Sequence, residues 1–600
     1  MITFGALIAA AYVLGDAAGR LLRIGGTWED HVLRWTAGTA LAGLIAMIVG
    51  AWSLQAASAV LYLLAALGLA AEVFAGRHTI PDSAERAPRA SFDMLEKASL
   101  AAIAGALLLT FLAATAPVTG WEASVAHMAL ASDYAREGRI HLQPGNVYAA
   151  CPHLAQSLYA VAFLSGGELA ATWLNWFFGA LSVGAVAALG VRVAGRRAGL
   201  VAAALYAAAP IFMDQAAAPS VDLALAALAT AALCALVRWY DTGRLGALLV
   251  SALLAGSSCG ARHTGYVVVA FLVAGVLAGG GRRRYTAAGI FVLMATLAAA
   301  PWLVRSALLA GNPFFPLLHN VFPSEFILYT AEAGIGVHTG TDASGPSGLT
   351  ALLRFPWDII MQPYLYDGWP KSPGGMVLVL GVPGLFLGGR RVRWLGAYGA
   401  AGVGVFFFFQ RLARYMLPFF IPLHIAAGAA ADRVRVGRRL VWGVVMLAFV
   451  YHLMLHAGAM HFKVPVLLGM ESRTEYLEAR IDRYPAFAWA NTHLRDGTLL
   501  TPDQRTFYLR MPTYQNHAAM AALANMPRDA QLAWLREHNI RYVLVPWDYL
   551  ETSPALASEL LPMFRQWRND TQHFDVIESM LLARPGGRID RVDFLEVRDE

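Results

Sequence analysis

The sequence has few charged side chains. Asp, Glu, Lys and Arg make up only 14% of its 600 residues, whereas a soluble domain carries roughly a quarter. Apolar stretches of about 17 to 25 residues recur through the first three quarters of the chain, and each could cross the bilayer as a helix. A soluble globular protein is therefore excluded, and the sequence predicts a polytopic α-helical membrane protein.

Cysteine is also scarce, and internal repeats and low-complexity tracts are missing. The three cysteines, Cys151, Cys234 and Cys259, provide neither a disulfide framework nor the ligand spacing of a structural metal site. Lys and Arg outnumber Asp and Glu by 46 to 40. In a membrane protein such an excess sets the topology, so no nucleic-acid partner is expected.

Fourteen apolar segments predict helices, which gives about 13–14 transmembrane helices. They cover residues 2–22, 35–53, 55–75, 98–117, 168–190, 198–217, 219–238, 244–260, 264–280, 285–307, 374–389, 393–409, 415–431 and 439–457. A shorter apolar piece, residues 154–165, is better suited to an interfacial or re-entrant helix.

The basic residues divide unequally between alternate loops. One set of loops contains about 22 Lys and Arg, and the other contains about eight. The positive-inside rule places the richer set in the cytoplasm. Loops 118–153 and 308–373 and the C-terminal tail are then expected outside it. The tail mixes charged with apolar residues, and it contains a β-branched run, RYVLVPW, after an amphipathic stretch, DAQLAWLREHN. A soluble extracytoplasmic α/β domain is therefore predicted there.

A cluster of charges directly follows an uncharged apolar run. The stretch GWEASVAHMALASDYAREGRIH, residues 120–141, contains two Glu, one Asp, two Arg and two His. In a regular α-helix Glu122 and His127 would lie about 140° apart around the axis, so they need not share a face. One interpretation is an amphipathic helix on the membrane surface whose charges are merely solvated. The other is a functional loop.

Further charged residues are expected at the outer ends of helices. Asp222 begins an apolar run, where a carboxylate is either functional or an N-cap. Arg262 and His263 lie at a second helix end, and Arg411 and Arg414 at a third. Arginine there either extends to lipid headgroups or holds a phosphate. Acids and arginines that meet outside the membrane favour a site for an anionic lipid headgroup and a proton transfer.

In this arrangement the chain resembles the GT-C membrane glycosyltransferases, and within them the bacterial branch related to protein O-mannosyltransferases and aminoarabinose transferases. The matching features, in order, are Glu122, His127, Tyr134, Gly138 and Ile140; Pro152 and Tyr159; Asp222; RHTG at residues 262–265; RSALLAGNPFFP at 305–316; and RYMLPFFIPL from Arg414. The family's loop acid is usually Asp, and this chain has Glu122 there. The resemblance implies three N-terminal helices in residues 1–97, a catalytic membrane module in 98–460 and the outer domain in 461–600.

The resemblance also implies an activity, that of a hexosyl- or pentosyltransferase. The donor would be a polyprenyl-phosphate sugar, the acceptor a glycan, lipid or protein, and the reaction inverting. The enzyme would lie among the lipids of the bacterial inner membrane, with its active site on the periplasmic side. Glu122 would be the base, with Asp222 and His127 as the other catalytic candidates. The phosphate-holding candidates are Arg262, His263, Arg305, Arg411 and Arg414.

Two questions stay open from the sequence. Some relatives use a divalent metal, for which Glu122 and Asp222 would be the ligands, but no local metal motif exists. The alternatives in function are a flippase or transporter of lipid-linked sugars and a polysaccharide polymerase or ligase. A transporter would place ionisable residues near mid-membrane and show repeat symmetry.

Overall fold

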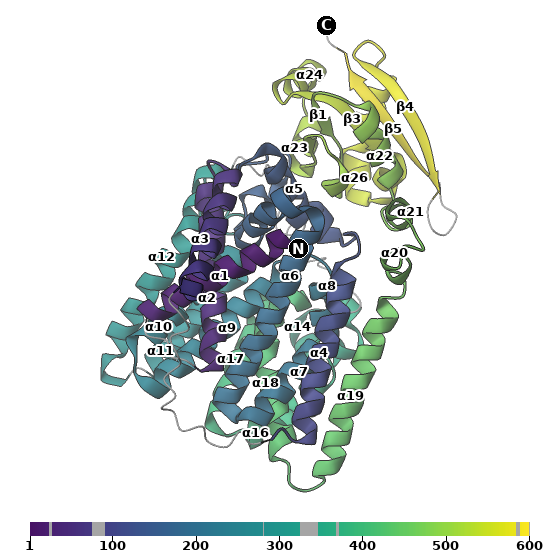
Figure 1. Ribbon diagram of the computed structural model, residues 1–600. Coiled ribbons are helices and arrows are strands. Elements are labelled where there is room, and N and C mark those ends of the chain that lie inside the picture. Colours follow the sequence, from purple (N-terminus) through teal and green to yellow (C-terminus); the bar gives the residue numbers. More distant parts are fainter. Residues whose placement is uncertain are drawn as a thin grey trace.

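A helical bundle and a small sheet domain make up the molecule (Figure 1). The computed structural model describes residues 1–22, 27–74, 91–279, 281–324, 346–367, 371–583 and 589–598. The described helices from α1 to α19 form the bundle, and the sheet domain is joined to one end of it through α20 and α21.

Within the described residues, nine helices are long and apolar enough to cross a membrane. They are α1 (Ile2–Leu21), α2 (Trp28–Gly50), α3 (Leu54–Phe74), α4 (Met94–Ala114), α6 (Leu154–Ala194), α9 (Asp222–Thr242), α12 (Arg284–Ala310), α17 (Gly389–Phe409) and α19 (Arg438–Ala459). The pair α7 (Arg196–Ala207) and α8 (Pro210–Ala217), bent by 60° at their junction, forms either a tenth, broken span or a re-entrant loop. The multi-pass membrane fold is thus confirmed.

The other predicted segments are helices too, but shorter ones. They are α10 (Leu245–Ala261), α11 (Thr264–Gly279), α15 (Met376–Val379) with α16 (Gly381–Leu387), and α18 (Leu417–Arg433). All fourteen segments therefore lie on helices, while fewer reach the length of a full span. The apolar pattern reports burial in lipid or in protein alike, so it identifies an apolar helix without fixing its length.

Residues 154–165 are predicted to be an interfacial or re-entrant helix. They form the first part of α6 and are buried from Leu154 to Ala162 within the bundle. The helix breaks at Gly167, whose φ of 65° is unfavourable for residues with a side chain. The apolar piece is a separate helical segment because of this break, and it packs inside the bundle.

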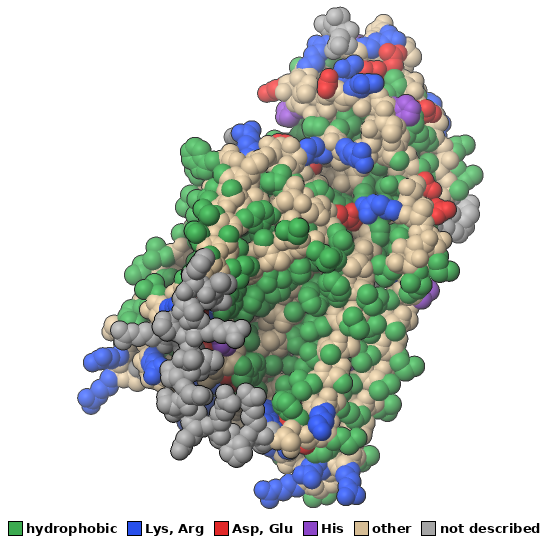
Figure 2. All heavy atoms as spheres, viewed as in Figure 1, with side chains coloured by type: hydrophobic (Ala, Val, Ile, Leu, Met, Phe, Trp, Pro, Cys, Tyr) green, Lys and Arg blue, Asp and Glu red, His purple; other side chains and the backbone are tan. Residues whose placement is uncertain are grey.

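The loop elements of the bundle are short. They are the π-helical turn η1 (Ala123–His127), α5 (Met128–Glu137), η2 (Val147–Ala150), η3 (Gly281–Arg283), α14 (Gly348–Met361), η4 (Pro363–Leu365) and η5 (Ala413–Met416). Large apolar side chains remain exposed on the bundle, among them Leu293, Leu297, Leu447 and Met454. Figure 2 shows such side chains covering the helical part, with Lys and Arg gathered at its far end from the sheet. A lipid-facing belt accounts for this surface.

The C-terminal domain is built on a five-stranded mixed sheet of order β2-β1-β3-β5-β4. Its strands are β1 (Thr498–Leu500), β2 (Thr513–Tyr514), β3 (Ile540–Pro546), β4 (Phe574–Ala583) and β5 (Ile589–Val597). β1 runs parallel to β2 and β3, whereas β5 is antiparallel to β3 and β4. The predicted strand RYVLVPW lies in β3, so the α/β character of the tail is confirmed.

Helices cover this sheet and complete its core. They are α20 (Val464–Leu467), α21 (Arg473–Glu478), α22 (Tyr484–His493), η6 (Thr506–Tyr508), α23 (His517–Ala524), α24 (Arg528–Glu537), α25 (Trp547–Thr552), α26 (Pro554–Glu559) and α27 (Leu561–Asn569). Phe564 and Trp567 of α27 pack in one core with Val543 and Val545 of β3. The boundaries at residues 97 and 460 stay predictions.

Candidate active site

The charged stretch between α4 and α6 forms a turn that the sequence did not predict. Residues 123–127 are π-helical, and Glu122 directly precedes them. A π-helix bonds residue i to i+5, so side chains five positions apart lie on the same face. Glu122 and His127 therefore face each other, with 3.8 Å between Oε2 and Nε2. The separation of 140° expected for an α-helix is wrong for this local reason.

Side chains from distant parts of the chain hold this turn. Arg505, in the connection between β1 and β2, donates to the Thr119 carbonyl at 2.8 Å. Gln515, directly after β2, donates to the Val125 carbonyl at 3.3 Å, and Asn146 donates to the same oxygen at 2.9 Å. The sheet domain is thus bonded to the backbone on both sides of Glu122. A solvated surface helix would need no such contacts.

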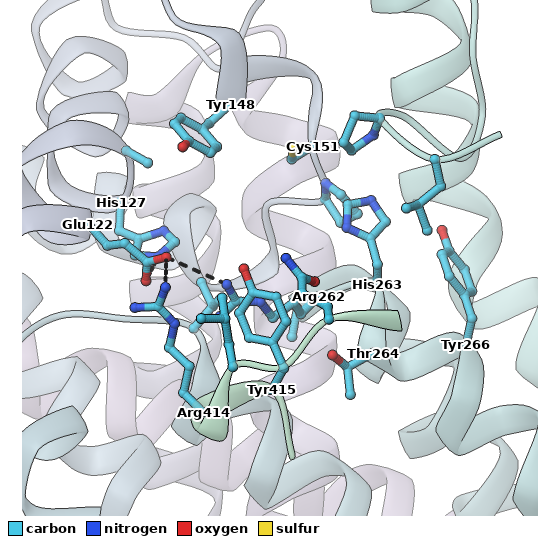
Figure 3. A pocket seen from close by; sticks show the side chains of 18 of the residues that line it. Glu122, His127, Tyr148, Cys151, Arg262, His263, Thr264, Tyr266, Arg414 and Tyr415 are labelled. Atoms are coloured by element: carbon cyan, nitrogen blue, oxygen red, sulfur yellow. Dashed lines mark ion pairs between the residues drawn. The ribbon is translucent and has the colours of Figure 1, made fainter. Parts of the chain in front are cut away.

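Two arginines meet the Glu122 carboxylate (Figure 3). Arg414, in η5 ahead of α18, reaches Oε1 at 2.9 Å, and Arg262, at the C-terminal end of α10, reaches the same oxygen at 3.7 Å. The Arg262 guanidinium also lies 3.6 Å from the centre of the Tyr415 ring. Three segments that are far apart in sequence therefore bring one carboxylate and two guanidinium cations together.

Each arginine has a second acidic partner. Asp222 is fully buried at the start of α9 and pairs with Arg262, while its Oδ2 has no hydrogen-bond partner among the described residues. It makes no N-cap bond, so the ion pair rather than capping accounts for its position. Asp367, in the connection between η4 and α15, accepts from the Arg414 backbone N–H at 3.0 Å, and Lys371 lies 3.1 Å away.

Glu122 and the two arginines border a cavity of about 380 Å³. Its wall is mostly apolar and aromatic, with contributions from Trp121, Tyr148, Tyr266 and Phe409. Glu122, His127, Arg262, His263 and Arg414 all line it. Of the described residues in the wall, Glu122 is the one carboxylate. An apolar cavity with convergent polar groups at one end is the usual form of a ligand site.

The remaining predicted site residues differ in whether they line the cavity. His263 lines the cavity, and its Nε2 bonds to the Phe315 carbonyl at 2.6 Å. Arg305 is buried and donates to the Ala149 and Cys151 carbonyls at 2.8 and 3.0 Å, outside the described cavity wall. Arg411 also lies outside that wall and donates to the Pro346 carbonyl. Arg305 thus ties the loop before α6 to α12.

Neighbouring charges set the pKa of Glu122 at the centre of the site. Burial raises the pKa of the Glu122 carboxyl, but Arg414, His127 and Arg262 together hold this pKa well below its usual range. Burial raises the pKa of Asp367, against the opposing effects of Arg414 and Lys371. Glu122 is therefore an anion at neutral pH, and it is a weak base for as long as the arginines remain paired with it.

The donor set does not suit a metal ion. Glu122 and Asp222 both face Arg262, so a guanidinium lies where a cation bridging the two carboxylates would bind. Across the described ranges, no group of three His, Cys, Asp or Glu side chains is close enough to hold a metal. A metal cofactor is not established for this chain.

The sequence did not predict three residues of the site, namely Asp367, Tyr415 and Arg505. Asp367 lies in an irregular loop segment, and only the lysine four positions on distinguishes it from other loop acids. Tyr415 follows Arg414 directly, but its place over Arg262 depends on packing between two helix ends. Arg505 reaches the turn from about 380 residues away in sequence.

The fold is the GT-C fold, and residues 152–304 match the family model described as dolichyl-phosphate-mannose-protein mannosyltransferase. The resemblance predicted from the sequence is thereby confirmed. A sequence comparison with curated proteins finds no match.

The chain is similar to several solved structures. ArnT from Cupriavidus metallidurans in the apo state aligns with a TM-score of 0.54 and 16% identity over 82% of this chain and 97% of that chain. The same protein bound to undecaprenyl phosphate gives a TM-score of 0.52 and 17% identity over the same shares. The Archaeoglobus fulgidus oligosaccharyltransferase in complex with Zn and sulfate gives 0.47 and 12%, over 82% and 72%.

Proposed function

We propose that this chain is a glycosyltransferase that moves a sugar from a polyprenyl-phosphate donor to an acceptor hydroxyl. The transfer would take place at the periplasmic face of the inner membrane. The observation that carries the proposal is the meeting of Glu122, Arg262 and Arg414 at one end of an apolar cavity. Sugar transfer needs a base for the acceptor proton and positive charge on the leaving phosphate. These three side chains provide both.

The cavity also suits an amphipathic donor. Its aromatic and aliphatic wall would contact the first part of a lipid chain, while the arginines at its polar end would hold the phosphate. ArnT is described as bound to undecaprenyl phosphate, and we take this class of lipid as the donor carrier here. The particular sugar is left open.

The reaction is expected to invert the anomeric configuration. A retaining reaction by double displacement needs a nucleophile in addition to the acid or base. In the described part of the cavity wall, Glu122 is the one carboxylate, and Asp222 is buried behind Arg262. A single displacement by the acceptor, assisted by Glu122, follows from this set of groups.

The site is expected to face the periplasm. It lies at the end of the bundle that contacts the sheet domain, because Arg505 and Gln515 bond to its turn. The arginine-rich connection between α18 and α19 lies at the opposite end (Figure 1). The positive-inside rule assigns that end to the cytoplasm.

Purified protein incubated with a polyprenyl-phosphate sugar and a candidate acceptor tests the proposal. A transferase releases polyprenyl phosphate and forms a new glycoside, and this is the expected result. Movement of intact donor across vesicles without release would instead identify a flippase. A growing polymer of repeated sugar units would identify a polymerase.

A further inference from the structure

The charged groups of the site form one continuous row of ion pairs. Carboxylates and cations alternate along it, in the order Asp222, Arg262, Glu122, Arg414, Asp367 and Lys371. Three negative charges thus face three positive charges, and the net charge of this row is zero without a ligand. The groups that also face Glu122 are His127, at 3.8 Å, and the ring of Tyr415, which lies beside both arginines.

A donor phosphate would disturb this balance. A phosphodiester adds one negative charge, which would remain unpaired in a mostly apolar cavity if all three carboxylates kept their partners. The side chains of Asp222 and Asp367 are only 0% and 3% exposed, whereas that of Glu122 is 22% exposed. Glu122 also holds both arginines through a single oxygen. Glu122 is therefore the carboxylate that a donor phosphate can displace from the two arginines.

We propose that Glu122 is an internal substitute for the donor phosphate, which pairs with Arg262 and Arg414 in the empty site and is displaced from them by the phosphate when the donor binds. The inference rests on the proposed function and adds an order of events to it. The carboxylate gains basicity only after the arginines have been taken over by the donor. Activation of the base is thus coupled to donor binding.

The chemistry balances on this sequence of steps. The freed Glu122 carboxylate takes the proton of the acceptor hydroxyl, whose oxygen forms the bond to the anomeric carbon. The bond from that carbon to the phosphate oxygen breaks, and its electron pair stays on the phosphate. One negative charge has then left Glu122 and one has appeared on the lipid phosphate, next to Arg262 and Arg414, where it is stabilised.

Substitution of Glu122 gives an unusual expected result. Glu122→Gln removes the competing charge, so affinity for undecaprenyl phosphate should rise by at least about fivefold while turnover is lost. A residue that merely supports the fold or contacts the substrate would lower affinity when it is removed. The measurement is direct binding of undecaprenyl phosphate to the full-length protein in detergent, alongside undecaprenol, the same lipid without phosphate.

The control is Glu137→Gln in α5. Glu137 pairs with His141 at 2.7 Å and lies outside the described cavity wall, so this variant removes a paired carboxylate near the site without touching the arginines. Its affinity should equal that of wild type. Undecaprenol should bind equally to all variants, because it has no charge to compete for Arg262 and Arg414.

The possible results separate the two proposals. Equal or weaker binding of undecaprenyl phosphate by Glu122→Gln overturns the substitute role, while the donor class stands. A matching gain for undecaprenol overturns it as well, because the effect would then come from the lipid chain. If the wild-type protein itself does not bind undecaprenyl phosphate, the proposed function fails.

Discussion

Gln156 donates a hydrogen bond to Nδ1 of His127 at 3.1 Å. In a neutral imidazole one nitrogen donates and the other accepts, so this bond leaves the ring proton on Nε2. Nε2 is the nitrogen that faces Glu122 at 3.8 Å. In this tautomer His127 points its Nε2–H toward the carboxylate, and we predict that it acts as a donor rather than as a second base.

This arrangement predicts an order of effects on turnover. Glu122→Gln keeps the size of the side chain but removes the base, so kcat should fall by roughly 10² to 10⁴-fold. His127→Gln should cost less, because only a donor is lost. Glu122→Asp should retain part of the activity. Steady-state kinetics of the purified protein will test this, and a Glu122→Gln variant with more than about a tenth of wild-type turnover would contradict the assignment.

The two arginines should differ in their effect on stability. Arg262→Ala leaves the fully buried Asp222 without its ion pair, which typically costs about 3 to 5 kcal/mol. Arg414→Ala should cost less, because Lys371 still lies 3.1 Å from Asp367. Thermal unfolding of both variants in detergent measures the difference.

The double variant Arg262→Ala/Asp222→Asn separates stability from ligand binding. It removes the unpaired charge, so it should recover much of the unfolding temperature lost in Arg262→Ala. Binding of polyprenyl phosphate should stay weakened, because one charged phosphate contact is worth about 1.5 to 3 kcal/mol. Arg411→Ala is the control, since Arg411 lies outside the described cavity wall. Full recovery of binding would show that Arg262 only neutralises Asp222.

Arg505 is predicted to be a positioning residue. Arg505→Ala removes the bond to the Thr119 carbonyl and should lower kcat by about tenfold through misplacement of Glu122, with little change in donor affinity. Arg505→Lys keeps a donor at this position and should restore part of kcat. The exposed Arg510→Ala is the matched control. A loss of donor affinity equal to the loss of kcat would indicate general disruption of the domain.

Glu122 should also give the protein a pH-dependent contribution to stability. Its pKa in the folded protein is below the unfolded value of about 4.3, so its ion pairs stabilise the fold above that pH. The contribution is lost as the pH falls through the lower, folded value. The Tm of wild type should therefore exceed that of Glu122→Gln above about pH 5, and the gap should close on acidification. The exposed Glu478→Gln should show no such trend.

The orientation can be tested by cysteine labelling in intact cells. A cysteine at the exposed position Arg565 should react with a membrane-impermeant reagent, since the sheet domain is predicted to be periplasmic. A cysteine at Tyr285, 70% exposed near the basic turn before α12, should react only after the cells are opened. Labelling in the reverse order would place the site in the cytoplasm. Gly345, a second labelling position in the loop 308–373 that is predicted to face the same side as Arg565, lies outside the described residues.

The sequence predicted the helical segments and picked out Glu122, Arg262 and Arg414, which the structure brings together, because apolar length and the clustering of charge are local signals. It could not distinguish Arg414 from Arg411, which lie three positions apart at one helix end. One lines the cavity and the other bonds to Pro346. That choice depends on how η5 packs against α10 and the turn at η1.

Other features of the site depend on contacts that no local pattern encodes. The π-helical turn at residues 123–127 reads as ordinary α-helix in the sequence, and its geometry is held by Asn146 and Gln515. Asp367 is fixed by the backbone N–H of Arg414. These pairings join residues 21, 390 and 47 positions apart, and they follow from tertiary structure, so they appear only when the chain is folded.

The bonds from Arg505 and Gln515 to the turn have a consequence for engineering. The sheet domain cannot be treated as an exchangeable module, because it supplies part of the scaffold that orients Glu122. A chimaera that takes its sheet domain from a relative will need that relative's loop between α4 and α6 as well. Natural variants at this joint are expected to change in pairs, one on each side of it.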